Sequence, residues 1–169
     1  MHSMGKHSRL FFASLALPIL AMPTAQAHGE GAATVSNSAI LLISLTSSVF
    51  LWSIGREWLS TNSCIGSPLV FCLAIFSGIT HVMLGLDDSL LIVGGIGVLG
   101  ILAASLSPKL SSFNTQLRVG LAAIVGVMFV GYFVANHDLH YILEDYLGIL
   151  TKIAELVLMQ QLPSNYWKA

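Results

Sequence analysis

Residues 77–88, SGITHVMLGLDD, interrupt a chain that is otherwise strongly apolar, and runs of apolar residues flank this stretch on both sides. His81, Gly85 and Asp88 stand at positions i, i+4 and i+7, so a helix that carried them would place all three on one face. Ionisable groups in hydrocarbon are costly unless they are paired, solvated or bound to a metal. The stretch therefore predicts a polar turn between two membrane helices. The histidine, one turn inside the apolar run, indicates a site beside that turn.

The composition places the whole chain in a lipid bilayer. Of its 169 residues, 55% are hydrophobic and only 9% are charged, whereas a soluble domain carries about 25% charged residues. The sequence therefore predicts an all-α fold, an integral membrane helical bundle of four to five transmembrane helices in one domain, residues 28–169. A formal net charge of −1 gives no indication of nucleic acid as a partner. Cys64 and Cys72 match no disulfide or zinc pattern and are interpreted as packing residues.

Residues 1–27 have the three parts of a secretory signal peptide. Lys6 and Arg9 supply the positive start, LFFASLALPILAM forms the apolar centre, and residues 25–27, AQA, form a small-x-small cleavage site. The alternative is an uncleaved first membrane helix, which the short, proline-interrupted apolar run disfavours. Cleavage would leave His28 as the new amino terminus, with an amine and an imidazole that suit copper or nickel.

Apolar stretches after the signal predict the membrane spans, over about residues 35–54, 68–84, 89–107 and 117–136. A fifth, less apolar helix over 141–161 continues a polar stripe that consists of His137, His140, Glu144, Gly148, Thr151, Lys152 and Glu155. This helix either lies flat at the membrane surface or spans with its stripe turned inward, and its wide apolar arc favours spanning. Glycines in the third and fourth spans predict close helix packing.

The signal peptide also predicts the orientation. With the mature N-terminus outside, counting spans places residues 85–88 and 136–140 outside as well. Arg56, Lys109 and Arg118 then fall at inner ends, as the positive-inside rule requires. We therefore expect a multi-pass protein of the cell (inner) membrane.

Histidines and carboxylates gather at the outer ends of the predicted helices. The candidate metal ligands are His28, His81, Asp87, Asp88, His137, His140 and Glu144. Imidazole and carboxylate groups at one depth form an environment that suits first-row transition metals. The pattern predicts a divalent transition metal ion, nickel, copper or cobalt, bound at the outer face.

The stretch SGITHVMLGLDDSLLIVGGIGVLG resembles the first motif of the hydrogenase and urease accessory membrane proteins, the HupE/UreJ family. That family combines a secretory signal, often a histidine directly after it, and an HPxxGxDH motif between apolar spans. His81, Gly85 and Asp87 match the motif. Val82 stands where the family has its proline, and Asp88 stands where it has its last histidine. The resemblance implies a role in nickel or cobalt entry.

Three functions are compatible with these residues. The first, which we favour, is a non-enzymatic membrane protein for metal uptake or metal binding. The second is a small non-catalytic subunit of a larger membrane metalloenzyme complex, in which glycine-rich helices pack against partner subunits or against further copies of this chain. The third is an intramembrane zinc hydrolase, which is disfavoured because the chain has no HExxH pair and only Glu144 as a candidate general acid or base.

Overall fold

The computed structural model describes residues 35–62, 65, 67–86, 88–136, 142 and 144–164. Every regular element in these ranges is helical, which confirms the predicted all-α class for this part of the chain. The elements are α2 (Asn37–Asn62), α3 (Pro68–Leu84), α4 (Ser89–Ser105), the 3₁₀ helix η1 (Pro108–Phe113), α5 (Asn114–Ala135) and α7 (Tyr146–Ser164). The expected signal peptide, residues 1–27, lies outside the described residues.

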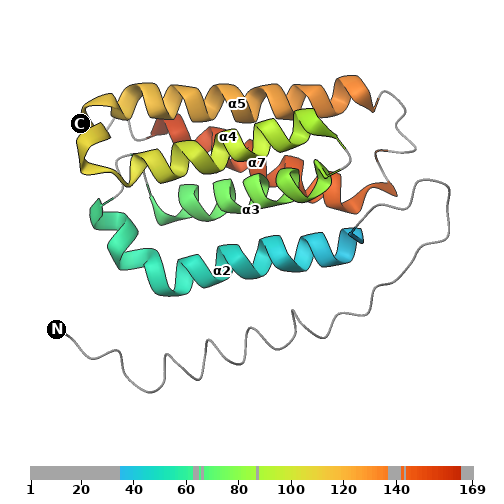
Figure 1. Cartoon of the computed structure of the whole chain (residues 1–169), viewed down its shortest axis with the longest axis horizontal. Coiled ribbons are helices and arrows are strands. Elements are labelled where there is room, and N and C mark those ends of the chain that lie inside the picture. The colour runs from blue at the N-terminus through green and yellow to red at the C-terminus, as the bar shows by residue number, and fades with distance from the viewer. Residues whose placement is uncertain are drawn as a thin grey trace, which may run out of the picture.

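The helices run side by side and alternate in direction along the chain (Figure 1). At one end of the bundle α3 and α5 finish and α2, α4 and α7 begin, and we call this the Asp88 end. The opposite end holds η1 and is called the Pro108 end. Helix α3 is central, because it packs against α2, α4 and α7, while α5 packs against α4 and α7.

Helices α3 and α4 approach each other closely at Gly95. A Cβ atom built at Gly95 would lie 2.7 Å from the carbonyl oxygen of Gly78 and 2.7 Å from a methyl carbon of Val82. The two backbones meet so closely because both positions are glycine, as expected for helices that associate in lipid. On the outer side of α4, by contrast, a Cβ built at Gly100 would meet no atom within 4 Å.

The main apolar core and the buried polar groups of α3 and α7 lie at different levels of the bundle. Its apolar core includes Leu59, Ile65, Val70, Phe71, Ala74, Val98, Leu102, Leu121, Val125, Leu158 and Leu162. On α3 the core residues Val70–Ala74 precede the buried polar residues of positions 77–81, and on α7 the core residues follow those of positions 151–155. In both helices this order places the apolar core residues towards the Pro108 end and the buried polar residues towards the Asp88 end.

The exterior is rich in large apolar side chains, including Leu45, Ile54, Leu90, Val93, Val127 and Val134, each more than half exposed. Two stretches, Asn37–Gly55 and Pro108–Ala135, are long and apolar enough to cross a membrane, and α3 and α4 are shorter apolar helices. Most residues of the two longer stretches are not buried, unlike those in the core helix of a soluble protein. An apolar exterior of this kind indicates membrane association.

Candidate functional site

The structure describes three of the seven predicted metal ligands: His81, Asp88 and Glu144. The other four lie outside the described residues: His28, Asp87, His137 and His140. His81 is buried in the last turn of α3, whereas Asp88 and Glu144 are exposed. Within the described ranges, no group of three or more histidine, cysteine, aspartate or glutamate side chains is gathered as for a metal ion. The predicted outer site therefore depends on residues beyond these ranges.

Gly85 and Asp88 build the tight turn between α3 and α4. The Asp88 carboxylate accepts a hydrogen bond from the backbone N–H of Leu90 at 2.9 Å and so caps α4. A side chain at Gly85 would collide with the backbone nitrogen of Ile92. Both residues have a structural role in the turn, which holds His81 one helical turn below it.

The His81 imidazole is oriented by its own helix. Its Nδ1 lies 2.8 Å from the carbonyl oxygen of Ser77. Because a carbonyl oxygen can only accept, we assign the ring proton to Nδ1, which leaves the lone pair of the neutral ring on Nε2. This Nε2 faces Oε1 of Glu155 at 3.5 Å, and both side chains are buried. An Nδ1–H bond to a backbone carbonyl is the support that usually orients a metal-binding histidine.

Glu155 of α7 is fully buried, and both of its carboxylate oxygens have partners. Oε1 accepts a hydrogen bond from the Ser77 hydroxyl at 2.9 Å, and Oε2 accepts one from the Lys152 ammonium at 2.7 Å. Charge-assisted bonds of this kind offset part of the cost of removing a carboxylate from water. They also join α3 to α7, two helices that are far apart in sequence.

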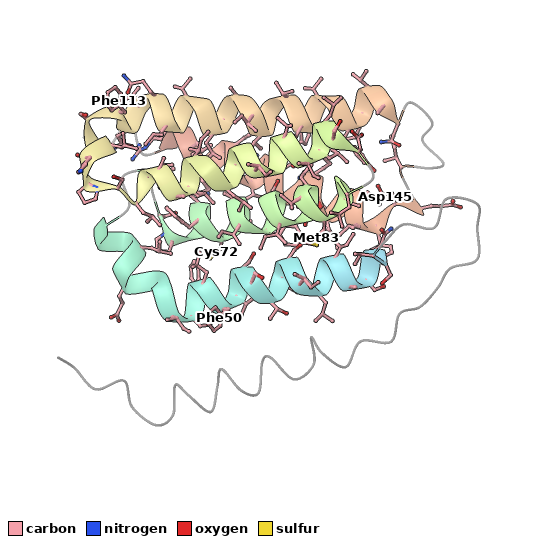
Figure 2. All side chains as sticks on the ribbon, viewed as in Figure 1. Phe50, Cys72, Met83, Phe113 and Asp145 are labelled. Atoms are coloured by element: carbon pink, nitrogen blue, oxygen red, sulfur yellow. The ribbon has the colours of Figure 1, made fainter. Side chains whose placement is uncertain are left out.

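The Lys152 ammonium extends the contacts to α5. It donates to the carbonyl oxygen of Met128 at 3.1 Å and lies 5.3 Å from the centre of the Tyr132 ring, within the range of a cation–π interaction. The Tyr132 hydroxyl in turn donates to Oδ2 of Asp145 at 3.0 Å. Figure 2 shows Asp145 at the Asp88 end, where α7 starts. A series of polar contacts thus connects that end to the buried charges.

We call His81, Lys152 and Glu155 the buried charged cluster. In a further buried contact, the Thr80 hydroxyl donates to the hydroxyl of Ser44 on α2 at 3.0 Å, and both residues are fully buried. Buried polar contacts therefore join α3 to α2 and α3 to α7, and the apolar core lies beyond them towards the Pro108 end.

The pattern of polar residues in the sequence predicted part of this arrangement. It placed Gly148, Thr151, Lys152 and Glu155 on one polar stripe, and all four are buried in the structure. It did not pair Glu155 with His81, and it did not place Tyr132 in the site. A signal for the pairing was present, because an acid and a base three residues apart in an apolar helix need each other and a further polar partner.

The fold and the site together define a helical bundle with an apolar exterior and a buried charged cluster near one end. No protein-family model, curated protein or solved structure matches the chain.

Proposed function

We propose that this chain is a multi-pass protein of the cell (inner) membrane that takes up or binds a divalent transition metal ion, nickel, cobalt or copper. The observation that supports this most directly is the buried pair of His81 and Glu155, in which Nε2 of the imidazole lies 3.5 Å from a carboxylate oxygen. Ionisable groups inside a lipid-facing bundle are costly and usually belong to ion or substrate paths. Nitrogen and oxygen donors suit these metals.

The Asp88 end is the entrance in this proposal and faces outside. His81, Asp88 and Glu144 belong to this end of the bundle. The remaining candidate ligands are His28, Asp87, His137 and His140, and of these Asp87 and His137 directly adjoin described residues at this end. They would capture the metal, with His81 nearest the interior. The partial resemblance to the HupE/UreJ family favours nickel or cobalt.

Metal binding to the purified mature protein tests the proposal. Equilibrium dialysis against Ni²⁺ or Co²⁺, followed by metal analysis, would compare the wild type with His81→Ala and with Glu57→Gln. Glu57 is an exposed acid on α2 towards the Pro108 end and serves as the control. We expect His81→Ala to weaken binding at least tenfold, about 1.4 kcal/mol, and Glu57→Gln to leave it unchanged. A wild type that binds no metal, or a folded His81→Ala that binds like the wild type, would show the proposal to be wrong.

A second candidate function is a packing subunit in a larger membrane complex. Gly100 on α4 and Gly131 on α5 are exposed, and a Cβ at either position would meet no atom within 4 Å. Exposed glycines on apolar helices permit another helix to approach closely. Under this function Gly100→Leu and Gly131→Leu would reduce the mass of the native complex isolated from the membrane, while His81→Ala would not.

A further inference from the structure

Lys152 occupies a position in which a metal cation would otherwise find its ligands. Its ammonium, which is almost completely buried, lies against Oε2 of Glu155, the carbonyl oxygen of Met128 and the face of the Tyr132 ring. We propose that Lys152 is a built-in cation that closes an interior metal site formed by His81, Glu155 and the Met128 carbonyl. This inference rests on the proposed metal-handling function and adds a means of control to it.

The groups around the ammonium, together with His81 beside the other oxygen of Glu155, form a suitable ligand set once the ammonium leaves. Glu155 offers a carboxylate, His81 offers the lone pair of Nε2, and Met128 offers a backbone carbonyl. Imidazole, carboxylate and carbonyl donors together suit a divalent first-row ion. While Lys152 remains, its positive charge neutralises the one carboxylate and repels a second cation from the same position. The site is therefore closed by charge as well as by volume.

A second possible partner for the ammonium, the Asp145 carboxylate, lies on the N-terminal side of Lys152. The Asp145 carboxylate folds over the first turn of α7, where Oδ1 accepts the backbone N–H of Gly148 at 2.8 Å. Gly148 is one helical turn before Lys152, just as Glu155 is nearly one turn after it. A Cβ at Gly148 would lie 2.6 Å from the Tyr132 hydroxyl, so the absence of a side chain leaves this space to Asp145 and Tyr132.

The Lys152 ammonium can reach the Asp145 carboxylate by rotation of its own side chain. Helical side chains lean towards the N-terminus of their helix, which is the direction from Lys152 to Asp145. The Tyr132 ring, already beside the ammonium, hydrogen-bonds to Asp145 at its far edge. When the ammonium pairs with Asp145, Glu155 and His81 become available to an entering metal. The exchange replaces the hydrogen bonds of the ammonium, but no covalent bond forms or breaks and no proton is transferred.

Cobalt binding to the full mature chain in lipid nanodiscs tests the inference. Equilibrium dialysis against Co²⁺ would compare the wild type with Lys152→Met, which removes the charge at similar length, and with Lys152→Met/Glu155→Gln. We expect a second, weak Co²⁺ in the wild type. We expect Lys152→Met to bind this second ion at least tenfold more tightly than the wild type does. We also expect this variant to melt at a higher temperature with Co²⁺ than without it. The added Glu155→Gln change should abolish both effects.

Asp145→Asn is the second variant, and it leaves the buried charged cluster in place. Because it removes the alternative carboxylate partner of Lys152, it should weaken the second Co²⁺ site at least tenfold. Unchanged binding would overturn the inference. If the wild type binds metal but Lys152→Met gains no affinity, the inference is wrong and the proposed function stands. If the wild type binds none but Lys152→Met gains a Glu155-dependent site, capture at the outer end is wrong and the interior site is confirmed.

Discussion

The pairing of Lys152 with Glu155 predicts a strongly non-additive effect on stability. Glu155 is fully buried, and its removal as Glu155→Leu would leave the Lys152 ammonium, in its present position, with the Met128 carbonyl and the Tyr132 ring. An uncompensated buried charge costs about 3–5 kcal/mol, and rotation of the ammonium to Asp145 would recover part of this cost. Lys152→Met should cost a similar amount, because it leaves the carboxylate with only its bond to Ser77 and its contact with His81.

The double variant Lys152→Met/Glu155→Leu should recover most of this loss. Replacing a buried ion pair by apolar side chains of similar volume is often neutral or stabilising, and the lost bond from Ser77 is worth about 1 kcal/mol. We therefore expect the double variant to unfold within about 1 kcal/mol of the wild type. The two single effects would then exceed the combined effect by several kcal/mol.

Unfolding of the four proteins by sodium dodecyl sulfate in mixed micelles, followed by circular dichroism, measures these free energies. Glu57→Leu, at an exposed position, is the control and should change stability by less than about 0.5 kcal/mol. If the two single effects add to within about 0.5 kcal/mol, the side chains act independently. The buried pair, and the interior site built on it, would then be refuted.

Three further predictions follow from the packing and from the expected topology. Gly95→Ala should lower the free energy of unfolding by about 1–3 kcal/mol, because its Cβ would press on the α3 backbone, whereas Gly100→Ala should not lower it; thermal melts would compare the two. Single cysteines at Ser89 and Asn136, in a cysteine-free chain, should react with an impermeant reagent from outside the cell, whereas a cysteine in η1 should react only after permeabilisation. Intact mass of the membrane-isolated protein should match a chain that begins at His28, and a mass that includes residues 1–27 would contradict the predicted cleavage.

The positions of the helices could be predicted because apolar runs and helix-ending residues agree. Pro68 and the GLDD turn bound α3, which covers the expected residues 68–84. α2 continues to Asn62 instead of ending near residue 54, because Gly55 is tolerated inside a helix and no proline follows before Asn62. Charged residues in that stretch predicted an end of the membrane span, which is a property of the surroundings and not of the helix.

The contacts between side chains of different helices in the site could not be predicted from helical periodicity. A helical period shows which residues share a face, and it correctly grouped Lys152 with Glu155, but it does not show which helix that face meets. Ser77 and Glu155 are 78 residues apart, and only the packing of α7 against α3 brings them together. Tyr132 was missed because an aromatic residue in an apolar span is ordinarily a packing residue.

The location of the buried charged cluster follows from the different side chains on two faces of α3. One face approaches α4 through Gly78 and Gly95, where a polar side chain has no room. The other face carries Ser77 and His81, which cannot be turned to lipid without losing their hydrogen-bond partners. The buried face of α7 also requires polar partners, because exposing Lys152 and Glu155 to lipid would be equally costly. Each helix therefore supplies the polar surroundings that the other requires, and the contact between α3 and α7 is where the ion pair of Lys152 and Glu155 is buried.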